Sequence, residues 1–497
     1  MVRRQQAMTT RESHMSQSDL FSWNMERDPA LRSTIVSVLI LDTDPDWDRL
    51  AETIDRGTRI VPRLRHRLVA APFGLAPPRW VLDSDFDLSW HLRRSALPAP
   101  ADLSAVLEFA RTEAMTAFDP ARPLWRSTLL SGLNGAGCAL VMTVHHSLTD
   151  GIGGIQIATA LLDFDRAGTE RAHPPEPSQD RDGALRDIVA WNWSVGSDLL
   201  LGGMRATPRT AWRAVTHPAR AARDGAALAT SLVRLAQPVT ATLSPVMTER
   251  SLRRRLAVLD APVEQLRRAA RAVGCTVNDA FLTAVVIGLR MYHDRHGARV
   301  DQLRVTMPIS LRTADDPLGG NRITLARFAL PADIPDTADL MRAVDAAVGA
   351  WRREPAIPLS GAVAAAFNRL PAGLLTEMLK HIDFLASNVP GSPVPLYIAG
   401  ARIDRMYAFG PTIGTAVNVT LTSHAGTCYI AINADTAAIP DIAILTDCLA
   451  AGFATVFRLG AEGESEAGAE LPAVSAEVGV SGAVTRKPED ARAPGCG

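Results

Sequence analysis

The feature that most constrains the fold is an apolar run, residues 138–144, that ends directly in the paired histidines His145 and His146. The run predicts a buried β-strand, and the following Asp150 and Gly151 predict that this strand stops in a loop. Successive side chains of a strand point to opposite faces of the sheet, so the two imidazoles cannot both face one cavity. We therefore expect one histidine to be reachable by a reacting group, and the other to be buried and held by hydrogen bonds.

Three interpretations of the histidine pair are open on residue type alone. Histidine is the side chain whose ordinary pKa lets it take and return a proton near neutral pH, and catalytic groups are commonly held where a strand gives way to a loop. A histidine at a strand end is also often a purely structural side chain. Paired histidines with an acid can bind a metal, but this chain lacks a third ligand at a suitable spacing and has no HExxH motif.

The glycines after the acid, Gly151, Gly153 and Gly154, argue against a long helix directly after Asp150. A helix is predicted only for residues 155–163. We therefore expect the Asp150 side chain to turn away from the histidines and to meet an arginine. A buried Asp–Arg pair of this kind would fix the loop that presents the reactive histidine.

The length of 497 residues exceeds one ordinary core and predicts two domains with tails. The first 15 residues are predicted to be disordered, residues 16–182 to form an α/β domain, and residues 250–459 to form a second one. Residues 460–497 have the Ala, Gly, Glu and Pro composition of a disordered tail. Between the domains, the arginine-rich residues 183–249 predict amphipathic helices that bridge the domains, with contact to an anionic lipid surface as the alternative.

Charge and cysteine usage exclude several classes of protein. A formal net charge of −1 argues against a general nucleic-acid binder. The 5 cysteines are scattered and form no CxxC pair, which argues against a disulfide framework or a zinc site and favours a reducing cytosol. The N-terminus shows no apolar region of a secretory signal, and no apolar run approaches the roughly 20 residues needed to span a bilayer. Any membrane contact is therefore expected to be peripheral.

Further motifs lie on both sides of the histidine pair, and together they span residues 16–459. They are Ser18-Asp19-Leu-Phe, Pro78-Arg-Trp80 with His91, Pro123-Leu124-Trp125, Asn278-Asp279, Pro308-Ile-Ser-Leu-Arg312, Gly320-Asn321, Ser387-Asn388-Val389-Pro390-Gly391 and Gly410-Pro411. In this order they resemble the bacterial wax ester synthase/diacylglycerol acyltransferase (WS/DGAT) family, whose HHxxxDG motif residues 145–151 match. Two small departures are Ser392, where a proline often follows, and an additional glycine at Gly319.

The resemblance implies two chloramphenicol-acetyltransferase-like α/β domains, each with a mixed sheet, and an active-site tunnel between them. It also implies an O-acyltransferase that uses acyl-CoA as co-substrate and needs no cofactor. A hydrophobic alcohol would be the acceptor, giving triacylglycerol from diacylglycerol, wax ester from a long-chain alcohol, or both. The expected location is the cytoplasm, in peripheral association with the inner membrane face or with lipid droplets.

The chemistry of a thioester agrees with this implication. The departing thiol has a pKa of about 8.5, so it leaves readily. The alcohol has a pKa near that of water, about 16, and must lose its proton as it attacks. One general base is therefore sufficient without an acyl-enzyme, and the chain indeed has no GxSxG elbow.

The resemblance assigns roles to individual residues. His146 is expected to be the base, His145 its supporting neighbour, and Asp150 a structural acid paired with Arg312. Gly151 would permit close backbone approach, with a nearby N–H stabilising the oxyanion. The other expected site residues are Asn278, as either a catalytic side chain or a part of the Thr276–Asp279 capping box, Pro123, Leu124 and Trp125 as packing beneath the tunnel, and Asn388 and Gly391 as substrate-binding residues that shape a cross-domain loop.

Two rival functions are compatible with the same sequence. One is a condensation-type transferase that takes its acyl group from a carrier-protein thioester, which would require a docking surface for the carrier. The other is a non-catalytic lipid-surface binding protein with a vestigial histidine motif. The intact set of base, acid and glycines argues against the second.

Overall fold

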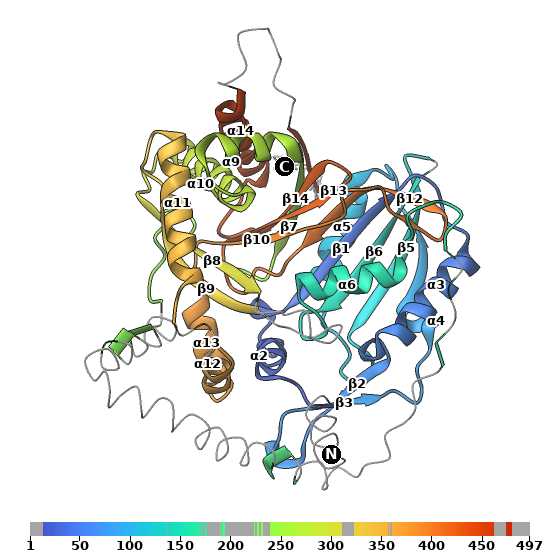
Figure 1. The fold of residues 1–497 in the computed structure, drawn as a ribbon. Coiled ribbons are helices and arrows are strands. Elements are labelled where there is room, and N and C mark those ends of the chain that lie inside the picture. The colour runs from blue at the N-terminus through green and yellow to red at the C-terminus, as the bar shows by residue number, and fades with distance from the viewer. Residues whose placement is uncertain are drawn as a thin grey trace, which may run out of the picture.

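The computed structural model describes residues 13–135, 137–169, 239–310, 323–355, 357, 360–461 and 474–479, with isolated positions at 171, 174–175, 189, 191–193, 223, 226–227 and 230–231. Two mixed β-sheets lie side by side in these residues (Figure 1). The α/β class expected from the sequence is confirmed.

The first sheet has six strands in the order β11-β12-β1-β6-β5-β4, and its neighbours are antiparallel except for the parallel pair β4 and β5. The strands are β1 (Thr34–Leu41), β4 (Leu92–Ala96), β5 (Trp125–Leu133), β6 (Gly137–His145), β11 (Tyr397–Ile398) and β12 (Ala401–Phe409). A small separate hairpin consists of β2 (His66–Val69) and β3 (Arg79–Leu82). The helices of this half are α2 (Gln17–Met25), α3 (Trp47–Ile60), α4 (Leu88–His91), α5 (Leu103–Met115) and α6 (Gly151–Leu161), with short 3-10 turns at Pro29–Leu31, Pro62–Arg65 and Pro72–Gly74.

The second sheet has seven strands in the order β15-β7-β14-β13-β10-β8-β9. Strand β10 is parallel to both of its neighbours, and the other pairs are antiparallel. The strands are β7 (Arg254–Pro262), β8 (Gln302–Ser310), β9 (Ile323–Pro331), β10 (Phe384–Val389), β13 (Val417–His424), β14 (Thr427–Asp435) and β15 (Ser475–Val478). The helices are α9 (Val263–Val273), α10 (Val277–Arg295), α11 (Thr337–Arg352), α12 (Ser360–Phe367), α13 (Ala372–Leu379) and α14 (Ile442–Ala461).

The two sheets do not divide the chain at one point in the sequence. Strand β12 lies within the predicted second domain, yet it pairs with β1 of the first sheet, with Val38 opposite Tyr407. The Tyr407 hydroxyl then donates to Asp260 of β7 at 2.7 Å. Residues 250–459 therefore do not form a self-contained unit, because one of their strands completes the sheet of the other half.

The predicted tails are shorter than expected at both ends. Met15 is fully buried and its N–H donates to the Pro78 carbonyl at 2.9 Å, so the ordered chain begins before residue 16. Within residues 460–497, β15 adds to the edge of the second sheet by pairing with β7. Short polar segments of this kind gain order from backbone hydrogen bonds to an open sheet edge, which composition does not reveal.

Most of the predicted helical linker, residues 183–249, lies outside the described residues. Its last part, residues 239–249, is described and contains no helix. The segment is instead fixed by side chains of the second half, since Ser244 contacts His293 Nε2 through its hydroxyl at 2.7 Å and donates its N–H to Asp383 at 3.1 Å.

Helix α14 is the one single helix in the described part of the chain that is long and apolar enough to cross a membrane; the bent pair α9 and α10 would qualify only if counted together as one span. Half of the most apolar 18-residue stretch of α14 is buried inside the protein, and Phe453, Val456 and Phe457 of this helix are fully buried in the core of the second half. Close packing against α10 is possible because Gly288 and Gly452 meet at the contact, where an added Cβ would collide with backbone atoms. Its apolar character is thus explained by core packing.

Candidate active site

Strand β6 carries the histidine pair to the junction between the two sheets. Its side chains alternate as expected, so Met142, Val144 and His146 face a cavity while His145 lies on the opposite side. The backbone is held on both sides, because the His145 N–H donates to Leu124 at 3.0 Å and the His146 N–H donates to Ser33 at 2.8 Å. The strand thereby presents a single imidazole to the cavity.

The Pro123-Leu124-Trp125 segment supports this arrangement from beneath. Leu124 is fully buried and supplies the carbonyl that holds His145. The Trp125 indole N–H donates to Leu64 at 2.7 Å, and the Trp125 carbonyl lies 2.7 Å from His91 Nδ1. Neither Pro123, Leu124 nor Trp125 is among the cavity-lining residues of the described chain, in agreement with the packing role expected for them.

His145 is enclosed in a polar and aromatic cage. Its Nδ1 accepts the Ser147 N–H at 3.1 Å, so in the neutral ring the proton is on Nε2. Nε2 lies 3.4 Å from the Glu26 carboxylate, and Glu26 in turn lies 3.6 Å from Arg32. The rings of Trp23 and Phe118 pack edge-on against the imidazole. His145 is therefore fixed in place and shielded, while its neighbour stays accessible.

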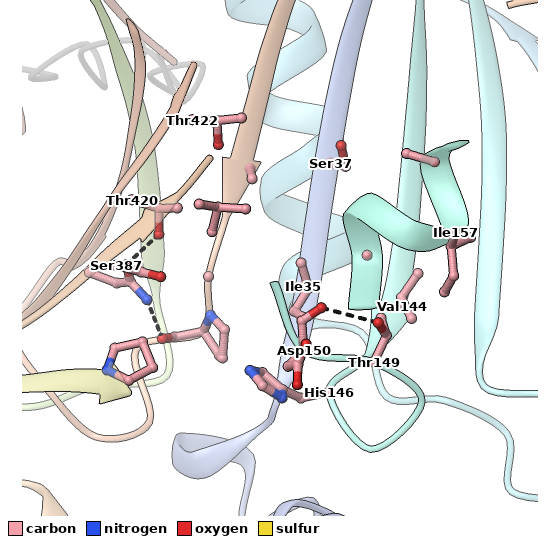
Figure 2. A pocket seen from close by; sticks show the side chains of 18 of the residues that line it. Ile35, Ser37, Val144, His146, Thr149, Asp150, Ile157, Ser387, Thr420 and Thr422 are labelled. Carbon is pink, nitrogen blue, oxygen red and sulfur yellow. Dashed lines mark hydrogen bonds between the residues drawn. The ribbon is translucent and has the colours of Figure 1, made fainter. Parts of the chain in front are cut away.

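His146 borders the cavity with its imidazole (Figure 2). Burial lowers the pKa of His146 below its ordinary value of 6.5, and the carboxylate of Asp150 partly opposes this effect. Its Nδ1 is buried and has no hydrogen-bond partner among the described residues. A neutral imidazole at neutral pH, open to an internal space, has the properties of a general base.

The prediction for the segment after Asp150 is wrong. Helix α6 starts at Gly151 itself, because the Asp150 side chain caps it by accepting the Gly153 N–H at 2.7 Å. The gain from an N-cap, typically about 1 kcal/mol, offsets part of the cost of glycines in the first turn. Asp150 is 1% exposed and lines the cavity with His146. Its predicted partner Arg312 lies outside the described residues.

The cavity has a volume of about 740 Å³ and lies between the two sheets. Figure 2 shows His146 and Asp150 on one side of the space and Ser387 and Thr420 of the second sheet on the other. Apolar side chains form most of the wall, and helices α2, α12 and α13 contribute to it. The lining side chains contributed by these three helices include Phe21, Met25, Val363, Ala364, Phe367 and Met378.

The structure separates the remaining predicted residues. Asp279 completes the capping box of α10 with Thr276, whereas the amide Nδ2 of Asn278 lies 3.9 Å from Met307 Sδ and Asn278 is not among the described residues that line the cavity. Gly391 does line it. Asn388 does not, because it alternates with the cavity-facing Ser387 and Val389 along β10.

Several lining residues were not expected from the sequence. Asn418 of β13 is buried and faces the cavity, where its amide donates to the Pro411 carbonyl at 2.7 Å and its oxygen accepts the Thr420 hydroxyl at 2.9 Å. The sequence signal that could have identified Asn418 is an asparagine side chain between apolar residues in the segment 415–421. Met406 and Ala408 of β12 could not have been found, because their strand crosses to the other sheet. Within the described chain, no three His, Cys, Asp or Glu side chains gather in a way that could hold a metal ion.

Comparison with known proteins places the chain in a family. Residues 15–281 match the profile of the wax ester synthase/diacylglycerol acyltransferase catalytic domain, and residues 319–456 match that of the WS/DGAT C-terminal domain. The chain belongs to the WS/DGAT family. A putative diacylglycerol O-acyltransferase of Mycobacterium tuberculosis is 33% identical to it over 441 residues, which cover 87% of this chain and 89% of that protein. The chain is therefore an acyltransferase of the WS/DGAT type.

Solved structures confirm the fold expected for a WS/DGAT protein. The wax ester synthase/diacylglycerol acyltransferase from Marinobacter aquaeolei superposes with a TM-score of 0.61 at 22% identity, covering 90% of this chain and 100% of that one. A starter condensation domain of rhizomide synthetase, solved in complex with C8-CoA, gives a TM-score of 0.58 at 15% identity, with coverage of 92% and 97%. The shared architecture is the pair of mixed sheets with a junction between them.

Proposed function

We propose that this WS/DGAT protein transfers a fatty acyl group from acyl-CoA directly to a hydrophobic alcohol, with His146 as general base. The observation that carries the proposal is the exposure of one neutral imidazole, that of His146, to a largely apolar cavity of about 740 Å³. An apolar wall suits a fatty chain and a lipid alcohol, and a base on that wall suits the proton removal from the alcohol, which is the chemically difficult step.

The step balances without a covalent enzyme intermediate. The alcohol oxygen attacks the thioester carbon while His146 takes the hydroxyl proton. The resulting tetrahedral oxyanion collapses, the carbon–sulfur bond breaks, and the imidazolium returns its proton to the departing sulfur. The products are an ester and free CoA, and His146 ends in its starting state. Burial disfavours the imidazolium form of His146 and lowers the pKa of this side chain. The carboxylate of Asp150 acts in the opposite direction and raises that pKa, so the imidazolium forms more readily than it would from burial alone.

A lipid surface is the proposed source of the acceptor. Two side chains that line the cavity are also exposed to the outside, Phe164 at 70% and Val394 at 45%. They give the cavity an apolar rim through which a diacylglycerol or long-chain alcohol can pass without crossing water. This rim supports peripheral association with a membrane or lipid droplet at the cytoplasmic side.

Thiol release is the measurement that tests the proposed reaction. Purified protein is given palmitoyl-CoA with diacylglycerol or one of a series of alcohols, and ester formation is followed in parallel. We expect one free thiol for each ester formed, with long-chain alcohols or diacylglycerol far better than ethanol. Ester formation only from palmitoyl-carrier protein would favour the condensation-type transferase. Flotation with lipid droplets without any thiol release would favour a non-catalytic lipid-binding protein.

The pH dependence of kcat/KM is predicted from the His146 environment. The active form of a general base is the neutral one, so activity falls as the pH falls through the pKa of the folded enzyme. Because burial lowers that pKa, the acidic midpoint is expected below 6.5, and most of the activity should be present at pH 7. The profile is measured with palmitoyl-CoA at constant ionic strength, after checking that the protein stays folded across the range. A midpoint above 6.5 would contradict the assignment.

A further inference from the structure

Helix α2 connects the cavity to the histidine pair through two neighbouring faces. The residues of one face recur at the three- and four-residue spacing of a helix and line the cavity; they are Ser18, Phe21, Ser22 and Met25. The face beside it carries Asp19, Trp23 and Glu26. The Trp23 ring packs edge-on against the imidazole of His145, with 5.5 Å between the ring centroids, and Asp19 lies 3.4 Å from Arg63. The helix that forms part of the cavity wall therefore also holds the buried histidine.

Glu26, at the C-terminal end of α2, is a buried acid. Its side chain is 10% exposed, and neither carboxylate oxygen has a hydrogen-bond partner in the described part of the chain. Oε2 lies 3.4 Å from Nε2 of His145, and Oε1 lies 3.6 Å from Nε of Arg32, two nitrogens that also lack a hydrogen-bond partner there. Burying a carboxylate with so few bonds costs stability, and an apolar side chain of the same length would fill the space without that cost. Packing therefore does not account for the charge of Glu26.

His145 holds the turn that contains His146. Its Nδ1 accepts the Ser147 N–H at 3.1 Å and lies 2.8 Å from the Ser147 hydroxyl, and its carbonyl accepts the Leu148 N–H at 2.9 Å. Since His146 lies between these residues in the chain, the same contacts hold the direction of its side chain. Nδ1 can accept the N–H only while it carries no proton, because a protonated ring nitrogen is a donor. The direction of the base therefore depends on which nitrogen of His145 bears the proton.

We propose that Glu26 is a positioning residue for the reaction: it keeps the proton of His145 on Nε2, and so preserves the turn that directs His146 into the cavity. This assignment rests on the proposed function. A carboxylate 3.4 Å from Nε2 attracts an N–H at that atom, and it repels the lone pair that the other tautomer places there. Glu26 is not among the described residues that line the cavity, so it acts through His145 and not on a substrate.

The variant Glu26→Met removes the charge and keeps the length of the side chain. Arg32 is 26% exposed and retains its bond to the Met115 carbonyl, so the change leaves no fully buried cation without a partner. A misdirected base slows the chemical step, and we expect kcat for ester formation to fall about 10- to 100-fold while the KM values for palmitoyl-CoA and for the alcohol stay close to wild type.

Ser16→Ala is the matched control on the same helix. Ser16 is the N-cap of α2 and accepts the Asp19 N–H at 3.1 Å, and it is not among the described residues that line the cavity. Its replacement weakens the helix without changing a group that contacts His145, so the unfolding temperature should fall and kcat should stay unchanged. An equal loss of kcat in Ser16→Ala and Glu26→Met would overturn the assignment, because any loosening of α2 would then have the same effect.

A double-mutant cycle with His145→Asn separates positioning from packing. The Asn amide oxygen can take the place of Nδ1 as acceptor for the Ser147 N–H, and an amide has no second tautomer to suppress. We therefore expect Glu26→Met to lower kcat by less than about twofold when it is added to His145→Asn. If Glu26 only packs α2 against the sheet, the two losses multiply, and the assignment fails.

The position of the proton is measured without turnover, by ¹⁵N NMR of the full chain labelled at its histidine nitrogens. The signals of His145 are identified by their loss in His145→Asn. Wild type should show a protonated Nε2 and an unprotonated Nδ1, and Glu26→Met should show the two tautomers mixed or reversed. An unchanged Nε2–H tautomer in Glu26→Met overturns the assignment. A tautomer that responds to Glu26→Met in a protein that releases no thiol would instead contradict the proposed reaction and leave the role of Glu26 at His145 standing.

Discussion

Replacing His146 by alanine is expected to lower kcat for ester formation by about 10²- to 10⁴-fold, the usual contribution of a positioned general base. The alcohol would then have to lose its proton to water, in a cavity whose wall is mostly apolar. The KM for acyl-CoA should change little, because the imidazole contributes only a small part of the lining. Thiol release from palmitoyl-CoA with a saturating alcohol gives both constants.

Folding should survive this change. The two hydrogen bonds that hold the end of β6 come from the backbone N–H groups of His145 and His146, and a side-chain truncation leaves both in place. The matched control is Ser37→Ala, which also shortens a polar side chain of the cavity wall but carries no proposed proton role. Thermal unfolding of both variants should stay near wild type. Turnover by His146→Ala close to the wild-type rate would remove the base assignment.

Replacing Gly391 by alanine is expected to damage both stability and activity. An added Cβ would lie 1.8 Å from the carbonyl oxygen of Ser423, a backbone atom that cannot rotate away. The loop after β10 must therefore shift, although the Gly391 N–H holds it to the Ser423 hydroxyl at 3.2 Å. We expect a loss of about 1–3 kcal/mol in the free energy of unfolding, the usual range for overpacking, or more. Because Gly391 and Val394 line the cavity, a shift of this loop should also lower kcat/KM.

The control for Gly391→Ala is a second glycine of the same cavity. An added Cβ at Gly154, in the first turn of α6, meets nothing within 4 Å. Gly154→Ala should therefore leave activity nearly unchanged and raise stability by about 0.5–1 kcal/mol, the usual gain for alanine over glycine in a helix. Denaturant unfolding and palmitoyl-CoA turnover distinguish the two variants. Equal behaviour of both would show that the close approach at Gly391 is unimportant.

Much of the site follows from short-range patterns. The two-residue period of a strand sends His145 and His146 to opposite faces, and this holds in the fold because β6 keeps its ladder up to His145. The capping box of Thr276 and Asp279 formed as its spacing predicts. The helix after Asp150 was missed, because glycine propensity argued against it and the sequence analysis did not count the Asp150 carboxylate as an N-cap.

The amino-acid sequence alone determined the family, the α/β class and the pair of histidines of which only one can face the cavity, since motifs and strand alternation depend on neighbours along the chain. The tertiary structure alone decided what surrounds that histidine. It brought β12 across to the first sheet and lined the cavity that His146 borders with Ser387 and Asn418 of the second sheet. Cavities arise where segments distant in sequence fail to fill the space between them, and no local pattern records how that space is shaped.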